Sequence, residues 1–249
     1  MIRCDERNPK ARELRDRLME HLPEGLVDDE LVVAIGGDGY LLSTVADLGT
    51  AHTFLGLNAG HMGFLLNDVD DFAHTAELLR RRDLRRYKFP LLHAHIAKTD
   101  GTIVEETAVN DVYLERSSGQ TARLTIAIED EVVVDTLVAD GVIFATALGS
   151  TAYNFSAGGM ACHPELPILT VTPICPHHPR LHPFALPPTL QARVTVQHPD
   201  RRPVRAVVDG RDTEPVEWVD IAFRGEQVTL AYLPGHDFTS RMVRKILRP

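Results

Sequence analysis

Residues 31–41 read Leu-Val-Val-Ala-Ile-Gly-Gly-Asp-Gly-Tyr-Leu, and this stretch is the most informative part of the sequence. Five apolar residues without a polar break predict a strand buried on both faces, as in a parallel sheet covered by helices. Gly36, Gly37, Asp38 and Gly39 follow directly. Glycines let a backbone turn sharply and approach a ligand, and the N–H groups of such a loop can hold phosphate oxygens. The stretch therefore predicts an α/β layer with an anion-binding loop.

Asp38 is the one carboxylate of this loop. Beside phosphate a carboxylate is costly unless it binds a metal ion or accepts a proton. One alternative stays open, in which Asp38 caps the following helix in an ordinary strand-to-helix turn. The loop lacks both the Lys-Ser/Thr of a Walker A loop and the spacing of a Gly-x-Gly-x-x-Gly fingerprint. We therefore expect backbone and metal, rather than a loop lysine, to hold any phosphate here.

The composition is that of an ordinary globular protein with a net negative charge. The 249 residues suit one large domain or two modest ones. A net charge of -9 argues against general nucleic-acid binding. Cys4, Cys162 and Cys175 lie far apart, so we expect neither a disulfide framework nor a cysteine zinc site. The sequence shows no signal peptide and no long apolar run, which favours a cytoplasmic location.

Strands and helices alternate in the first third of the chain. Asn8-Pro9 is typical of a helix start, and Ala11, Leu14, Leu18 and Leu22 then share one face. The pattern further predicts a strand at 31–35, a helix carrying Leu41, Leu42 and Val45, a strand at 53–57 and a helix at 69–82. Strands and helices that alternate at this spacing predict a small parallel α/β layer.

The pattern changes near residues 87–90, where alternating apolar residues indicate a β-rich half. Strands are expected around 92–96, 112–114, 124–128, 132–134, 194–197, 204–208, 218–223 and 228–232, with tight turns at 129–130 and 224–226. Residues 238–247 are again helical in pattern. We expect an α/β domain at 1–88, a β-rich domain at 89–236, and a helical segment at 237–249 that returns to the first domain.

Two segments of the β-rich half carry polar groups typical of a nucleotide site. Asp140-Gly141 leads a strand into Gly149-Ser150-Thr151, where hydroxyls and N–H groups make an anion-tolerant turn. Alternatively, Ser150 or Thr151 simply caps a helix. The pair Asn110-Asp111 stands at a strand start and could bind a base and a ribose, with the capping of a turn as the alternative.

Together these segments resemble the NAD kinase family over nearly the whole chain. The family's GGDG motif is matched at 36–39, its Asn-acidic pair at 110–111, and its GSTAY-type segment at 149–153. Residues 58–65, with the pattern Asn-x-Gly-x-x-Gly-Phe-Leu, and residues 172–177 also look like family segments in the expected order. Five segments in order are far more specific than GGDG alone, which other kinases share.

The resemblance implies an N-terminal Rossmann-like α/β domain and a C-terminal all-β domain. It also implies transfer of a phosphoryl group from ATP or polyphosphate, with a divalent metal such as Mg, to the 2′-hydroxyl of the adenosine ribose of NAD. Asp38 would accept or orient the hydroxyl proton, and Gly36, Gly37 and Gly39 would shape the loop around the donor phosphates. The dinucleotide would be bound by Phe64, Asn110, Asp111, Asp140, Thr151, Ala152, Tyr153, Asn154 and Ser156. The family further implies a homodimer or homotetramer built through the β-rich half.

Several residues depart from the family pattern at the site. They are Tyr40 for Thr, His61 for Arg, Asp111 for Glu, Val138 for a basic residue, Ala147-Leu148 for Pro-Thr and Arg211 for Gln. Two other functions therefore stay open. One is a related phosphotransferase acting on another hydroxylated nucleotide, a sugar or a lipid. The other is a non-catalytic nucleotide-binding regulator, against which the intact Asp38 argues.

Overall fold

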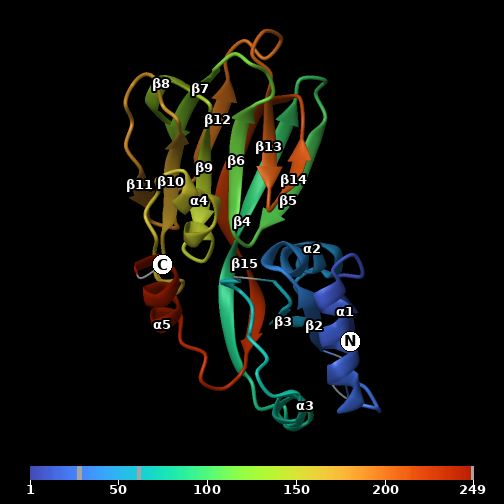
Figure 1. The fold of residues 1–249 in the computed structure, drawn as a ribbon. Helices are drawn as coiled ribbons and strands as arrows, with labels where there is room; N and C mark the ends of the chain where they lie inside the picture. The colour runs from blue at the N-terminus through green and yellow to red at the C-terminus, as the bar shows by residue number, and fades with distance from the viewer. Residues whose placement is uncertain (27–29, 61–62, 248–249) are drawn as a thin grey trace. The chain divides into compact units, whose positions relative to one another are not determined.

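The structure, a computed structural model, describes residues 1–26, 30–60 and 63–247. The chain forms two compact units (Figure 1). The first unit contains Met1–Phe89 and Gln227–Pro249, and the second contains Pro90–Glu226. Of the family-like segment at 58–65, His61 and Met62 lie outside the described residues.

The first unit is built on a parallel sheet. Its strands are β1 (Ile2–Cys4), β2 (Leu31–Gly36), β3 (Thr53–Asn58) and the last part of β15 (Val216–Tyr232), in the order β1-β2-β3-β15. Every pair in this order is parallel. All six residues of β2 are buried, as a central strand covered on both faces requires. The expected parallel α/β layer is confirmed.

Helices complete the first unit. They are α1 (Pro9–Glu20), α2 (Asp38–Leu48), α3 (Phe72–Arg81) and α5 (Phe238–Met242), which continues as the π-helix η2 (Val243–Leu247). Asn8 caps α1, since its side-chain oxygen accepts the N–H of Lys10 at 3.0 Å and Pro9 takes the first helical position. The third helix begins later than Val69 because Asp71 caps it, accepting the N–H of His74.

The second unit is built almost entirely of antiparallel strands. They are β4 (Arg85–Lys98), β5 (Ile103–Ala108), β6 (Asp111–Arg116), β7 (Ala122–Ile128), β8 (Glu131–Ala139), β9 (Gly141–Thr146), β10 (Leu169–Ile174), β11 (Phe184–Leu186), β12 (Ala192–Val196), β13 (Val204–Val208), β14 (Arg211–Thr213) and the first part of β15. One run of strands has the order β11-β10-β9-β6-β13-β14, and another has the order β15-β12-β7-β8. Both contribute to one core, in which Val112 and Phe144 of the first run cluster with Leu124, Val194 and Val219 of the second. The expected all-β half is confirmed.

Two predictions along the chain were wrong. Residues 224–226 form no turn, because β15 runs from Val216 to Tyr232 as one strand with Gly225 at a φ of 82° inside it. The second domain boundary also moves, from 236 to 226, because Thr229–Ala231 pair with β3 of the first unit. Among the described residues, none of the helices is long and apolar enough to cross a membrane.

Candidate active site

Asp38 stands at the start of α2, directly after the buried strand β2. The N-cap is Gly37, which makes no side-chain bond, and Asp38 is the first helical residue. Its carboxylate instead accepts the backbone N–H of Phe64 at 2.8 Å and that of Leu65 at 3.2 Å. Asp38 therefore does not cap its own helix, and the alternative interpretation of the loop is wrong. The carboxylate is held in place by a second loop, which carries Phe64, 26 residues later in the sequence.

Two of the three glycines around Asp38 provide room, whereas at Gly36 a Cβ would lie 2.8 Å from the side chain of Tyr40. None of Gly36, Gly37 and Gly39 has a positive φ, so the turn does not require left-handed backbone. A Cβ atom at Gly37 or Gly39 would meet nothing within 4 Å among the described residues, which leaves open space beside Asp38. At Gly63 a Cβ would lie 2.8 Å from a carboxylate oxygen of Asp38. Gly63 therefore lets the two loops approach closely.

Tyr232 and Arg241 also belong to this part of the first unit, and sequence analysis missed both. The hydroxyl of Tyr232 is buried and has no hydrogen-bond partner among the described residues. Burial, and then the charge of Asp38, raise the pKa of Tyr232. Arg241 binds the loop that carries Phe64. Both residues look like ordinary members of a strand and a helix in the sequence, so no local signal reveals them.

In the second unit, Asp209 organises the loop that carries Asn110 and Asp111. Its carboxylate accepts the backbone N–H groups of Val109, Asn110 and Asp111 at 2.7, 2.9 and 3.2 Å. Asp209 lies in the tight turn between β13 and β14, with a φ of 45°. Sequence analysis did not assign it to the site, because Asp-Gly in such a position is an ordinary hairpin turn.

Asp111 is a buried carboxyl group beside this second carboxylate. Only 5% of Asp111 is exposed. Burial, together with the nearby charge of Asp209, raises the pKa of Asp111 to about 7. Three N–H donors favour the charged form of Asp209, although burial still raises its pKa. The neighbouring side-chain oxygen of Asn110 is buried without a hydrogen-bond partner in the described part of the chain.

The turn at Gly149–Thr151, a 3₁₀ helix, is tied to the Asn110 loop. A Cβ at Gly149 would lie 2.1 Å from the carbonyl oxygen of Asn110, so only glycine fits. The hydroxyl of Thr146 donates to the carbonyl of Val109 at 2.8 Å and accepts the N–H of Gly149 at 3.0 Å. The structure thus brings two of the predicted motifs together, although they stand about 40 residues apart in the sequence.

Of the residues that follow Gly149, some are buried and bonded within the protein, and others are accessible. Ser150 caps no helix, since its buried hydroxyl donates to Ala147 and accepts from the N–H of Cys162. Asn154 is fully buried, and its amide binds the carbonyl oxygens of Ser150 and Met160 and the hydroxyl of Thr172. The more accessible residues are Thr151, Ala152 and Tyr153, which are partly exposed, and Ser156, which is exposed. Tyr153 belongs to the short helix α4 (Tyr153–Ser156), and its ring lies edge-on to that of Tyr113, with centroids 4.9 Å apart.

Asp140 stands between β8 and β9 and is already paired. The guanidinium of Arg116 donates to its carboxylate at 2.6 Å and also to the carbonyl of Ser118. Both side chains remain about one third exposed. Sequence analysis singled out Asp140 without Arg116, because the two residues meet only through the pairing of neighbouring strands.

Comparisons with known proteins place the chain in a family. A family model described as the ATP-NAD kinase C-terminal domain matches residues 109–222. The NAD kinase of Rhizobium meliloti is 33% identical over 246 residues, which cover 96% of this chain and 92% of that protein. The NAD kinase of Brucella suis is 35% identical over 227 residues, covering 89% and 86%.

Two solved structures have a similar fold. A yeast NADH kinase crystallised with NADH superposes with a TM-score of 0.78 at 26% identity, over 88% of this chain and 65% of that one. An NAD kinase from Archaeoglobus fulgidus in complex with ATP superposes with a TM-score of 0.73 at 21% identity, over 99% and 95%.

Proposed function

The chain belongs to the NAD kinase family, and we propose that Asp38 accepts the proton in the reaction of this family. The protein is a phosphotransferase with an alcohol acceptor, and its reaction is the ATP-dependent phosphorylation of NAD to NADP. The observation that supports the role of Asp38 is its carboxylate, held by two backbone N–H groups beside Gly37 and Gly39, which leave open space among the described residues. A structural cap would have bound its own helix instead.

In the proposed step the 2′-hydroxyl oxygen of the adenosine ribose attacks the γ-phosphorus of ATP. The bond from that phosphorus to the bridging oxygen breaks, ADP leaves, and the hydroxyl proton passes to Asp38. Phosphoryl transfer needs mostly positioning and charge neutralisation from the protein. The open space at Gly37 and Gly39 lets phosphate oxygens approach the backbone at the start of α2, where a helix favours negative charge.

We propose that the second unit binds the dinucleotide. The unpartnered oxygen of Asn110 is an acceptor that suits the amino group of adenine. Asp111 suits a ribose hydroxyl, and near neutral pH its carboxyl group can donate as well as accept. Thr151, Ala152 and Tyr153 offer an accessible turn and an aromatic face. The side chain of Asn154 is already used within the protein, so we assign it to the framework of the site.

A divalent metal ion, Mg²⁺ by expectation, would reach the site with the triphosphate. Mg²⁺ in nucleotide sites typically takes one or two carboxylates and completes its shell with phosphates and water. Among the described residues no group of three metal-ligating side chains gathers. We propose that the phosphates and Asp38, the one carboxylate of the glycine loop, would hold the ion. When bound, it would neutralise charge on the transferring group.

We also propose a homodimer or homotetramer assembled through the β-rich unit, and the cytoplasm as the location of the enzyme. Edge strands need to be covered or paired, and β8 ends one run of strands with Val132 and Val133 about half exposed. In such an assembly the loop at 175–178 would lie close to a neighbour's nucleotide. Light scattering tests this proposal, and a fully active monomer of 27.6 kDa would reject it.

The acceptor and donor are tested with the purified chain. NAD, NADH, another nucleotide, a sugar and a lipid alcohol are each offered with ATP and with polyphosphate, and the position of the new phosphate is read by ³¹P NMR. We expect phosphate on the 2′-oxygen of the dinucleotide. Phosphorylation of a different alcohol would favour a related phosphotransferase. Binding of NAD without turnover under every condition would favour a nucleotide-binding regulator.

A further inference from the structure

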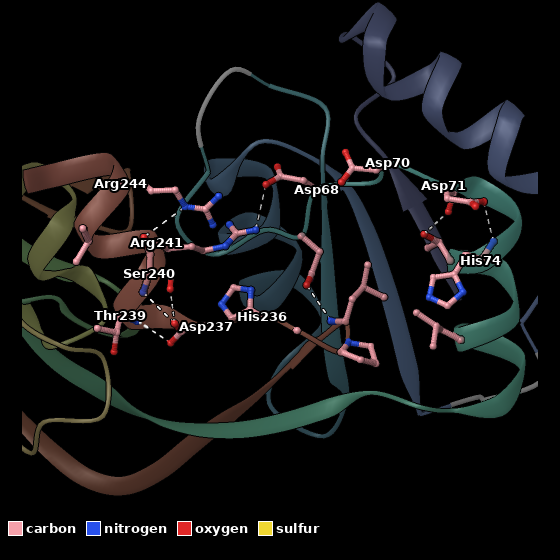
Figure 2. Close-up of a pocket in the computed structure, with 17 residues that line it drawn as sticks. Asp68, Asp70, Asp71, His74, His236, Asp237, Thr239, Ser240, Arg241 and Arg244 are labelled. Carbon is pink, nitrogen blue, oxygen red and sulfur yellow. Dashed lines mark hydrogen bonds and ion pairs between the residues drawn. The ribbon is translucent and has the colours of Figure 1, made fainter. Parts of the chain in front are cut away.

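Arg241 of the C-terminal helix α5 binds the loop that holds Asp38. Its guanidinium donates to the carbonyl of Leu66 at 2.6 Å and to that of Gly63 at 3.2 Å, and it pairs with the carboxylate of Asp68 at 3.1 Å. Only 11% of the Arg241 side chain is exposed. Figure 2 shows the side chain reaching from α5 toward Asp68. Three bonds from one planar group fix its position closely.

The bond to Gly63 has a direct geometric consequence. The carbonyl of Gly63 and the N–H of Phe64 belong to one planar peptide group and point in opposite directions. An arginine that holds this carbonyl therefore also fixes the direction of the N–H, which donates to Asp38 at 2.8 Å. The bond to Leu66 restrains the other end of the same short segment.

The far end of the segment is anchored independently. Asn67 donates to the carbonyl of Gly56, and its side-chain oxygen accepts the N–H of Leu233 at 2.9 Å. The loop therefore keeps its general path through Asn67 even if the guanidinium is removed. What Arg241 adds is the orientation of the peptide between Gly63 and Phe64.

We propose that Arg241 is a positioning residue for phosphoryl transfer, which orients the Gly63–Phe64 peptide so that its N–H holds the Asp38 carboxylate. The inference rests on the proposed function, because it takes Asp38 as the reacting carboxylate. A loose peptide weakens one of the two backbone N–H bonds to the Asp38 carboxylate, so the carboxylate is positioned less precisely against the attacking hydroxyl. Turnover then falls, while the binding of NAD, which we assign to other residues, stays the same.

Arg244 provides a matched control on the same helical segment. It is exposed, and in the described structure its guanidinium donates to the carbonyl of Ser240 on its own helical segment. Both arginines line one cavity of about 710 Å³, which also touches Asp68 and His74 (Figure 2). The cavity gives a small cation access to the place that a truncated Arg241 would leave.

The experiment compares Arg241→Ala, Arg241→Lys and Arg244→Ala with the unchanged chain. We expect Arg241→Ala to lower kcat by about 10- to 100-fold, the scale of a misplaced catalytic group, with KM for NAD changed less than about threefold. In the unchanged chain one guanidinium nitrogen donates to both carbonyls, while the other pairs with Asp68. The single ammonium nitrogen of Arg241→Lys cannot reproduce both sets of contacts, so kcat should also fall. Added methylguanidinium should restore part of the turnover of Arg241→Ala, and Arg244→Ala should behave as the unchanged chain.

Hydrogen exchange of the peptide containing residues 63–68 separates positioning from folding. Faster exchange there in Arg241→Ala, with an unchanged Tm, supports the proposal. The proposal is overturned if the kcat of Arg241→Ala equals that of Arg244→Ala. It is also overturned if hydrogen exchange at residues 63–68 is unchanged in both Arg241 variants. Asp38→Asn keeps the two proposals apart. If Asp38→Asn retains turnover, the role of Asp38 fails. If Asp38→Asn is inactive and both Arg241 variants turn over normally, only the role of Arg241 fails.

Discussion

Replacing Asp111 with Asn should flatten the pH dependence of stability of the second unit. The pKa of Asp111 is raised from 3.8 to about 7 in the folded chain, so the folded state keeps a proton that the unfolded state has lost. This contribution to stability is fully present below pH 4 and is lost as the pH rises through 7. The full shift of about three units corresponds to about 4 kcal/mol, of which about 3 kcal/mol is lost between pH 5 and pH 8. Asparagine has no proton to lose, so the variant should lack this fall.

The assay is urea unfolding at pH 5 and pH 8, followed by the fluorescence of Trp218. Trp218 is the one tryptophan of the sequence and lies in the same unit as Asp111. The free energy of unfolding of the unchanged chain should fall about 3 kcal/mol more over this interval than that of Asp111→Asn. Asp200→Asn, at an exposed position, is the control and should keep the full fall. An equal fall for Asp111→Asn and the unchanged chain between pH 5 and pH 8 would show that Asp111 does not titrate in this range.

Two further substitutions test the dinucleotide site. Gly149→Ala drives a Cβ into the carbonyl of Asn110, so it should lower the free energy of unfolding in urea by about 1–3 kcal/mol and weaken NAD binding. The control is Gly119→Ala, whose Cβ meets nothing within 4 Å among the described residues and which should change neither quantity. Asn110→Ala removes the proposed acceptor for adenine. The free energy of NAD binding should weaken by about 1–3 kcal/mol, which raises KM for NAD, while kcat changes little. An effect of Asn110→Ala on KM for ATP alone would move this residue to the donor site.

Local signals predicted the elements that local chemistry determines. Asn8-Pro9 starts α1 as expected, because a cap and a first-turn proline act within a few residues. The apolar run at 31–35 is the fully buried central strand β2. The predicted turn at 224–226 fails for the opposite reason. Exposed Arg-Gly-Glu looks like a turn, yet β15 continues through it. The strand pairs with β12 before these three residues and with β3 after them, and neither pairing can be read from the three residues themselves.

The sequence motifs indicated the candidate site, but they did not reveal the residues that hold its loops in place. Asp209 holds a loop about 100 residues away, and Arg241 holds one more than 170 residues away, so neither contact has a signature in the neighbouring sequence. Residue type also does not separate a ligand-binding amide from a framework amide. Asn154 looked suitable for the dinucleotide, but it is fully buried and binds its own chain.

The most direct test of the central claim is the turnover of Asp38→Asn at saturating ATP and NAD, with NAD binding measured on the same preparation by calorimetry. Asparagine keeps the size of the side chain and an oxygen that accepts the N–H of Phe64, but it cannot accept the hydroxyl proton. We predict that kcat falls about 100-fold or more while the Kd for NAD stays within about threefold. Near-native turnover in Asp38→Asn would contradict the account.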